Sequence, residues 1–405
     1  MSRKSDLRRR AGRLYRRATG DDVQTLRTEL TELAGEVSAL SAKIQQLDPG
    51  RLKQADVAIV SDFRLPGGTT ASIAEEVRAQ SAAGVSTALI HAQSETTKTT
   101  VGFSSHIQQV MPLDGVHIVS ARATLHTRVL VIRHPKVIET APALFAGLTA
   151  DHVVIVANHP AVDAAGTWQY HVQQTDSRVR QLFNVEPVWA PISPVVRQSI
   201  AAQAPDARTP DVRVSEQDWV NIFGTVPEVP ARNGFVGDKP VIGRHSRPQR
   251  EKWPDTAEDL MAAYPDTGKW RVEILGGAEI PEQILGSVPA AWHVQPFGAE
   301  DPQSFLARVD FWVYMHHRQW REAFGRAIIE ALAAGCVVVL PAYLEEIFGT
   351  AAVYSDPAGV QGTLAEYWQH PEQFLAQSRR AQEFAAEFGP ARHLQRLKNY
   401  GVSNV

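Results

Sequence analysis

Short apolar runs alternate with helical stretches along most of the chain, and this alternation limits the fold more than any other feature. From residue 55, VAIVSDF is followed by TTASIAEEVRAQSAAG and then by VSTALIHA. A succession of strand, helix and strand makes parallel strands that are joined by crossover helices. Further apolar runs are GVHIVSA, RVLVIRHP, HVVIVANHP and PVWAPIS, and helical segments such as PALFAGL and DSRVRQLF lie between several of them.

A second series of the same kind begins after a break. Residues 204–238 contain Pro, Asp and Gly with little periodicity, which is typical of a linker. The second series runs through PVIGRHS, WRVEILGG, AWHVQPFG, DFWVYMHH, CVVVLPA and AAVYSD. At 405 residues and 44% hydrophobic, the chain is too long for one core and fits two domains with an appendage. The sequence therefore predicts an α/β fold of two facing doubly wound, Rossmann-like domains, 55–203 and 239–390, with a C-terminal tail at 391–405. Ligands of such sheets bind at the carboxyl ends of the strands.

The segment ahead of the first domain has a heptad pattern. Apolar residues recur there at steps of three and four, with β-branched residues at three of four a positions and Leu at every d position. This pattern predicts a coiled-coil helix over 23–48 that makes a parallel homodimer through 23–47. The alternative is one amphipathic helix that folds back on the body. The seam consists of Val23, Leu26, Leu30, Leu33, Val37, Leu40, Ile44 and Leu47.

Residues 1–22 form a basic arm. Within 1–20, eight Lys and Arg residues stand against one acid, Asp6, although the whole chain carries a net charge of −3. A basic arm with Leu7, Leu14 and Tyr15 suits an anionic membrane surface. A solvated arm is the alternative. A nucleic-acid partner is disfavoured, because the acidic body shows no extended basic surface and no recognition-module signature.

The compartment follows from cysteine usage and hydropathy. The one cysteine, Cys336, lies in an apolar run and excludes a disulfide framework, so a reducing compartment is expected. No apolar stretch reaches the roughly 18 residues of a transmembrane helix, and the N-terminus lacks a secretory signal pattern. We therefore expect a cytoplasmic protein, peripheral at the inner membrane face if the arm binds lipid.

Two carboxylates flank a tight backbone in the second domain. REAFGRAIIE places Glu322 and Glu330 eight positions apart around a Phe-Gly pair. FGRAIIEALAAG predicts a helix whose first turn lies at 323–326, where free N–H groups attract phosphate. Glu330 lies within reach of a ribose, whose vicinal hydroxyls a carboxylate accepts. This spacing fits a nucleoside diphosphate along the helix start, although two glutamates on a helix are more often solvated.

A basic cluster follows the first strand of the same domain. VIGRHSRPQREKWP, residues 241–254, carries Arg244, Arg247, Arg250 and Lys252 at a strand end, where a doubly wound sheet binds anions. Cations on either side of a diphosphate stabilise a leaving group that gains negative charge. Together with the two glutamates, the cluster predicts a nucleotide-diphosphate site.

EAFGRAIIEALAAGCVVVLP resembles the Glu-x7-Glu segment of the family-4 retaining glycosyltransferases, which have the GT-B architecture of two facing Rossmann-like domains. GRHSRPQREKWP is similar to the family's Gly-Arg and downstream Lys segment, with a longer spacer and Lys-Trp in place of Lys-Gly. PGGTTASIAEEV is similar to its first-domain glycine loop. RVLVIRHP and HVVIVANHP resemble two successive strands that each end in His.

The resemblance implies a role for each matching residue. Glu322 would meet the hydroxyls of the donor sugar and Glu330 the ribose, while the backbone of Ala323, Phe324 and Gly325 would hold sugar and phosphate. The catalytic set would be His159, Glu322 and Arg244. His159 would lie near the reacting carbon; Asn158 could share that role, and His134 would be less critical. The alternative is that His159 is a structural residue. The remaining donor-binding residues would be Gly67, Gly68, Arg244, Lys252, Gly277 and Phe297, and a core position is an equal alternative for Phe297.

We therefore expect a retaining glycosyltransferase that moves a sugar from a nucleotide-diphosphate donor, commonly UDP-linked, to an acceptor hydroxyl. The acceptor would be a glycan or lipid-linked chain in envelope polysaccharide or teichoic-acid-like synthesis. The resemblance implies no cofactor and no metal. The adjacent His316 and His317 could suggest a metal pair, but neighbouring residues on a strand point to opposite faces. Two alternatives stay open: a sugar-nucleotide epimerase or hydrolase of the same fold, and an inactive coiled-coil scaffold that binds nucleotide sugars. The first-domain stretches 102–115 and 163–174 show no recognisable motif for the acceptor.

Overall fold

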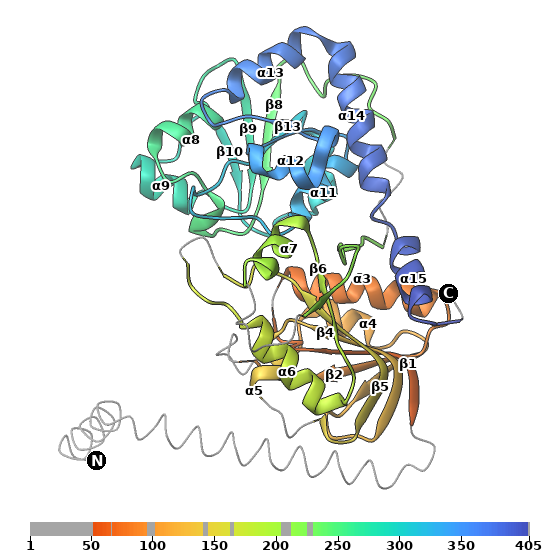
Figure 1. The fold of residues 1–405 in the computed structure, drawn as a ribbon. Coiled ribbons are helices and arrows are strands. Elements are labelled where there is room, and N and C mark those ends of the chain that lie inside the picture. The colour runs from red at the N-terminus through yellow and green to blue at the C-terminus, as the bar shows by residue number, and fades with distance from the viewer. Residues whose placement is uncertain are drawn as a thin grey trace, which may run out of the picture.

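A computed structural model describes residues 52–65, 67–94, 102–140, 145–162, 166–203, 212–224 and 230–403. The chain folds into two domains, each with one parallel sheet flanked by helices (Figure 1). The predicted basic arm at 1–22 and the coiled-coil helix at 23–48 lie outside the described residues.

The N-terminal domain carries a seven-stranded sheet with the order β3-β2-β1-β4-β5-β6-β7. Within the described residues, the strands of this sheet pair in parallel. Its helices are α3 (Gly68–Ala82), α4 (Ser105–Val110), α5 (Lys136–Thr140), α6 (Val172–Phe183) and α7 (Pro194–Ala201). Its strands are β1 (Gln54–Ser61), β2 (Thr87–His91), β3 (Val116–Val119), β4 (Leu125–Arg133), β5 (Leu148–Ala157), β6 (Val188–Pro191) and β7 (Arg213–Val214).

The C-terminal domain repeats the plan with six strands in the order β10-β9-β8-β11-β12-β13. This is the doubly wound order. Strands β8 to β10 extend the sheet toward one edge and strands β11 to β13 toward the other, so the topological switch point lies between β8 and β11. The strands are β8 (Val241–His245), β9 (Arg271–Leu275), β10 (Trp292–Gln295), β11 (Phe311–Val313), β12 (Val337–Leu340) and β13 (Val353–Tyr354). The helices are α8 (Ala257–Ala263), α9 (Glu279–Leu285), α10 (Pro302–Leu306), α11 (Arg326–Ala333), α12 (Glu345–Phe348), α13 (Val360–Gln369) and α14 (Pro371–Ala386). After them, α15 (Pro390–Asn399) lies against α3 of the N-terminal domain.

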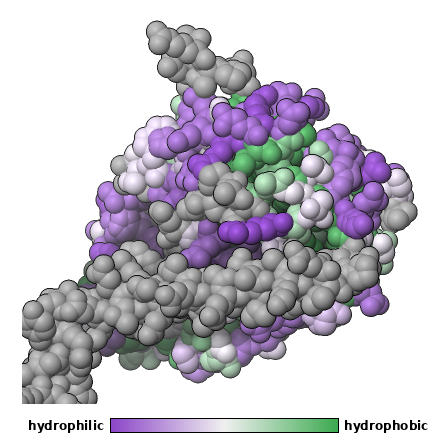
Figure 2. Space-filling model, turned by 90° about the horizontal axis from the view of Figure 1, so that it is seen from below, coloured by the Kyte–Doolittle hydropathy of each residue, from purple (hydrophilic) through white to green (hydrophobic). Residues whose placement is uncertain are grey.

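Most strand residues are apolar and buried because helices cover both faces of each sheet, and the exposed residues of β4 and β5 lie near the start of each strand. The residues of β12 are all buried, as is Cys336 just ahead of it, and burial raises the pKa of that thiol to about 11. Hydrophilic residues cover much of the described surface in Figure 2, with apolar residues gathered in one part of that face. None of the described helices is long and apolar enough to span a bilayer.

The predicted linker and tail take part in the N-terminal domain. Residues 213 and 214, within the predicted linker 204–238, pair with β6 as a seventh strand. The predicted tail begins inside α15, which packs on α3 beside the first sheet (Figure 1). Where the chain passes from the first domain to the second and where it returns, the two segments are hydrogen-bonded to each other: Phe223 N–H donates to the carbonyl of Phe388 at 2.9 Å.

The helix predicted over PALFAGL is described only from residue 145. Phe145 lies in a 3-10 turn and β5 already begins at Leu148, so the described part contains no α-helix. The turn ahead of it needs a glycine, because a Cβ at Gly147 would lie 2.7 Å from the carbonyl oxygen of Ala123. The close approach of two backbones at this point favours a turn into the sheet.

Candidate active site

The backbone between Glu322 and Glu330 turns at Gly325. Gly325 has a left-handed φ of +81°, and α11 begins after it at Arg326, not at residue 323 as predicted. A Cβ at Gly325 would also lie 2.4 Å from Cδ1 of Ile328, so glycine is required there. The amides of 323–325 donate to no acceptor within the described part of the chain. They are therefore available to an anion at the start of α11.

Glu322 is held by a cation and a phenol. Its Oε2 lies 2.5 Å from Nζ of Lys252 and accepts the hydroxyl of Tyr314 at 2.7 Å. Burial alone would raise the pKa of Glu322, but the charge of Lys252 and these hydrogen bonds more than offset it and lower the pKa to about 2. Glu322 is therefore a carboxylate at neutral pH, and the structure brings together the predicted residues Glu322 and Lys252.

A hydrogen-bond chain fixes the backbone beside Glu322. Glu322 N–H donates to the hydroxyl of Tyr343 at 2.8 Å, so that hydroxyl donates in turn to Nε2 of His316, 2.9 Å away. Nδ1–H of His316 then donates to the carbonyl of His317 at 2.9 Å. Burial lowers the pKa of His316 to about 4, which keeps the ring neutral and able to accept. Both ring nitrogens of His316 thus take part in this series of hydrogen bonds.

Glu330 is held by a histidine and an arginine. Its Oε2 accepts from Nε2 of His245 at 3.0 Å, and its Oε1 accepts from Nε of Arg326 at 3.0 Å. Nδ1 of His245 accepts the indole N–H of Trp312 at 2.9 Å, which places the proton of the neutral ring on Nε2. Burial opposes ionisation of Glu330, but His245 and Arg326 lower its pKa. The carboxylate stays partly exposed and keeps lone pairs for further donors.

Arg244 lies deeper than predicted. Its side chain is fully buried at the end of β8, and the guanidinium donates to the hydroxyl of Tyr264 at 2.6 Å, to the carbonyl of Met315 at 2.9 Å and to the carbonyl of Lys252. It also lies over the ring of Trp253, 4.1 Å from the centroid. In this conformation the buried guanidinium of Arg244 donates to acceptors within the protein and is not exposed for contact with a diphosphate. It positions the segment that carries Lys252, and the direct contact stays a prediction.

Two predicted nucleotide contacts lie on strand-end loops of the C-terminal domain. Gly277 follows β9, and its amide and that of Gly276 both donate to the carbonyl of Gln295 at 2.9 Å. Phe297 follows β10 and is 62% exposed. The core alternative for Phe297 is therefore wrong, because its ring faces solvent at the carboxyl end of the sheet, where a base could stack on it.

The glycine loop of the first domain reaches the second domain. Gly67, at the start of α3, has a φ of +131°, and a Cβ there would lie 3.2 Å from Nη1 of Arg247. No atom lies within 4 Å of such a position at Gly68. Glu75, farther along α3, lies 3.8 Å from Nη2 of Arg326 and accepts the amide of Gly224 at 2.7 Å. The start of α11 is thus linked to the N-terminal domain.

The two strand-end histidines of the first domain are close and neutral. The rings of His134 and His159 lie 4.9 Å apart, and His134 has a left-handed φ of +87°. Burial lowers the pKa of His134 to about 3 and that of His159 to about 4. The carbonyl of His159 accepts the hydroxyl of Tyr170 at 2.7 Å. Beside it, Asn158 accepts from Nη1 of Arg133 at 3.4 Å.

Sequence reasoning missed four residues that hold the two glutamates: Tyr314, Tyr343, His245 and Arg326. Two of them lie inside motifs that the sequence analysis had singled out, His245 next to Arg244 and Arg326 next to Gly325. Their position could have drawn attention to them. Tyr343 follows β12 in a stretch without a motif, so only the fold brings it to Glu322.

Comparisons with known proteins agree in fold but not in sequence. No family model matches the chain, and no curated protein matches its sequence significantly. Among solved structures, HepE of Anabaena in complex with UDP and glucose has a TM-score of 0.61 at 13% identity, over 86% of this chain and 100% of that chain. A glycosyltransferase of Rickettsia africae has a TM-score of 0.58 at 12% identity, over 87% and 100% of the two chains. The lipopolysaccharide outer core galactosyltransferase WaaB, in its apo form, has a TM-score of 0.55 at 11% identity, over 86% and 99%.

At these identities the likeness establishes the fold. The predicted GT-B architecture of two Rossmann-like domains is confirmed. Membership of family 4 stays a prediction, as do the roles assigned to individual site residues.

Proposed function

We propose that this chain is a glycosyltransferase that moves a sugar from a nucleotide-diphosphate donor to an acceptor hydroxyl. The observation that carries the proposal is the arrangement of groups at the N-terminus of α11. Glu322 and Glu330 flank it as two carboxylates with lowered pKa values, and unpartnered amides of 323–325 lie between them. HepE, which shares the fold, was solved with UDP and glucose, and this supports a UDP-linked donor.

The donor would lie along the start of α11. The amides of 323–325 and Lys252 would meet the diphosphate, Glu322 the hydroxyls of the donor sugar, and Glu330 the ribose. Phe297 offers an exposed ring to the base. Lys252 already lies beside Glu322, so its charge is in place before the leaving group gains charge, which is the arrangement that favours a transition state.

We propose that transfer proceeds with retention of the anomeric configuration, by front-face departure. The bond between the anomeric carbon and the phosphate oxygen breaks, and the acceptor oxygen forms its bond to that carbon on the same face. The leaving phosphate takes the acceptor's proton. A neutral His159, with a pKa near 4, would accept or donate a hydrogen bond near the reacting carbon without adding charge.

The acceptor is proposed to be a glycan or a lipid-linked glycan of the cell envelope. WaaB, a structural neighbour, acts on the outer core of lipopolysaccharide. Membrane attachment through 1–20 and dimerisation through 23–47 stay predictions, because both segments lie outside the described residues.

The test is a panel of UDP-, GDP- and ADP-sugars screened for thermal stabilisation, followed by product analysis with and without candidate acceptors. A bound donor should raise the melting temperature of the protein. Glu330→Ala should remove most of that shift, and Glu383→Gln, at an exposed position of α14, is the matched control. The anomeric configuration of the product tests retention. Donor turnover without an acceptor would indicate an epimerase or hydrolase, and stabilisation by a donor without any turnover would indicate an inactive scaffold.

A further inference from the structure

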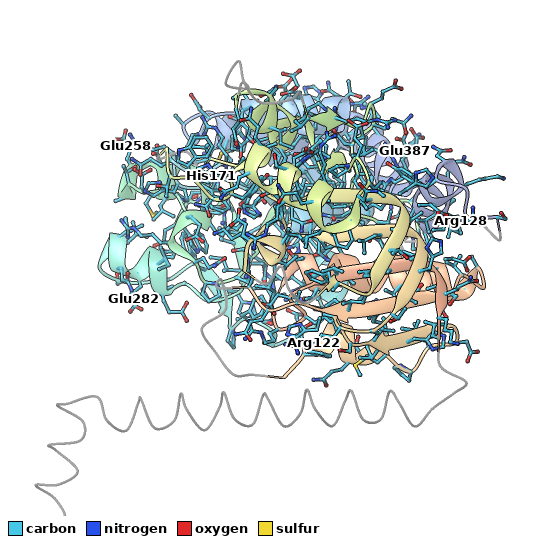
Figure 3. The ribbon with its side chains drawn as sticks, turned by 60° about the horizontal axis from the view of Figure 1, so that its bottom comes forward. Arg122, Arg128, His171, Glu258, Glu282 and Glu387 are labelled. Atoms are coloured by element: carbon cyan, nitrogen blue, oxygen red, sulfur yellow. The ribbon has the colours of Figure 1, made fainter. Side chains whose placement is uncertain are left out.

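An exposed aromatic pair lies ahead of α6. The ring of Trp168 is 51% exposed and stacks on the ring of His171, with centroids 4.6 Å apart and planes at 28°. Among the described residues, Trp168 and Phe297 are the two aromatic side chains in the set of large exposed hydrophobics. Phe297 belongs to the C-terminal domain and Trp168 to the N-terminal domain. Figure 3 labels His171 on the loop just before α6.

The fold holds this pair in place. Trp168 forms an antiparallel bridge with Val162, and the amide of Gln169 donates to the carbonyl of Ala161 at 2.8 Å. Tyr170, two residues beyond Trp168, is buried; its hydroxyl donates to the carbonyl of His159, and the two rings meet edge to face at 5.3 Å. The exposed pair is therefore part of the same local structure as the strand-end histidine.

The segment that carries the pair contains no charged residue. Residues 166–174, GTWQYHVQQ, contain aromatic and neutral polar side chains but no Lys, Arg, Asp or Glu. A flat ring with neutral hydrogen-bonding groups beside it matches a pyranose, which presents a face of C–H groups and a rim of hydroxyls. Sites for small uncharged ligands combine aromatic surface with a few polar groups in this way. An anionic headgroup or a phosphate would call for basic residues instead.

We propose that the Trp168–His171 pair is an acceptor subsite that stacks against a neutral pyranose ring of the acceptor glycan. The proposal rests on the proposed transferase function and names its acceptor class. Two residues of extended chain span at most about 7 Å, so Trp168 lies within the length of a short oligosaccharide from Tyr170 and His159. The subsite would thus hold a sugar unit near the one that receives the donor.

The test uses saturation-transfer NMR on the full-length protein with UDP present. The probes are methyl glucoside, methyl galactoside, maltose, cellobiose and lactose. We expect at least one probe to receive saturation from the wild-type protein, Trp168→Phe to retain the signal, and Trp168→Ala to weaken binding by about tenfold, the size of one aromatic stacking contact. Ile118→Ala is the control: Ile118 is 42% exposed on the edge strand β3 and should leave binding unchanged.

The possible failures are distinguishable. If none of the UDP-, GDP- and ADP-sugars raises the melting temperature of the wild-type protein, the proposed function fails. If UDP binds but no pyranoside does, or if Trp168→Ala binds the probes as the wild type does, the acceptor subsite is rejected. Binding of phosphatidylglycerol vesicles that is lost in Trp168→Ala would also overturn it, in favour of a lipid contact. Because Trp168 is exposed, its variants should fold, and the melting temperature without ligand verifies this.

Discussion

The half of the site on the C-terminal domain consists of charged pairs, whereas the half on the N-terminal domain consists of neutral rings. On α11 and the loop before it, Glu322 is paired with Lys252, and Glu330 with Arg326 and His245. At the ends of β4 and β5, burial keeps His134 and His159 uncharged at neutral pH.

This difference matches what each half would bind. A diphosphate brings negative charge and gains more as its bond to sugar breaks, so fixed cations and amides on one side stabilise it. Sugar rings are neutral, and an uncharged surface suits them without competing charges. The contrast teaches that one fold, repeated twice in a chain, acquires different chemistry from the residues at its strand ends.

The largest effect should come from Lys252. Lys252→Ala removes the cation beside Glu322 and beside the proposed diphosphate, and we expect transfer to slow by roughly 100- to 1,000-fold, as loss of one preorganised donor does elsewhere. The measurement is kcat/KM with the best donor of the panel. Lys269→Ala, at an exposed lysine of the same domain, is the control. A rate within a fewfold of wild type would show that the charged half does not stabilise the leaving group.

Next comes Arg244. Arg244→Ala leaves three buried acceptors without their donor, and we expect a loss of about 3 to 5 kcal/mol in the free energy of unfolding. Urea unfolding of the variant measures it. The resemblance to family-4 enzymes further predicts turnover slower by on the order of 100-fold if Arg244 also contacts the leaving group. Wild-type stability combined with slow turnover would contradict the positioning role and favour the direct contact.

His159 and Glu322 should contribute to stability over different acid ranges. A histidine whose folded pKa is about 4 and whose ordinary value is 6.5 stays neutral in the folded protein while the unfolded chain binds a proton. His159 therefore contributes stability that is present above pH 6.5 and is lost as the pH falls toward 4. Each such group adds a slope of up to about 1.4 kcal/mol per pH unit.

Glu322 should lose its contribution to stability at a lower pH than His159 does. Its folded pKa is about 2 against an ordinary 4.5, so its contribution is present above pH 4.5 and is lost as the pH falls toward 2. Urea unfolding across this pH series, for the wild type, His159→Asn and Glu322→Gln, checks both ranges. His159→Asn should flatten only the upper range. An unchanged slope there would mean that the histidine is not neutral in the folded protein.

The smallest effect should come from the contact that joins the halves. Glu75 of α3 meets Arg326 of α11 at 3.8 Å and accepts the amide of Gly224. Glu75→Gln weakens the ion pair with Arg326 and a second one with Arg78 at 3.1 Å, each worth up to about 1 kcal/mol at a partly exposed site, so we expect the KM for the donor to rise about two- to fivefold at unchanged kcat. A fall in kcat with constant KM would argue against a role in donor binding.

Sequence patterns predicted the sheets well because strands buried on both faces are apolar along their length. The runs around Val57, Val241 and Val337 all became strands for this reason. β7 was not predicted, because two residues are too few to show a strand pattern. α15 was predicted to be a tail, although His393 and Leu397 are buried against the first domain.

The sequence predicted only those site residues that lie in recognisable motifs. Glu322 and Lys252 were both predicted to lie in the site, and the structure brings them together because they follow the neighbouring strands β11 and β8. The inward direction of Arg244 could not be predicted, because it depends on Tyr264 and Met315, which are distant in sequence. The exposure of Phe297 was likewise undecided, since an aromatic residue after a strand suits a core and a surface equally.

The hydrogen bond between Phe223 and Phe388 bears on how the molecule can move. The two connecting segments meet at this point, so we expect it to serve as the hinge between the domains. A single hinge point would let the domains open and twist but would restrict sliding of one past the other. Opening far enough to release a spent nucleotide would then need no break in either sheet.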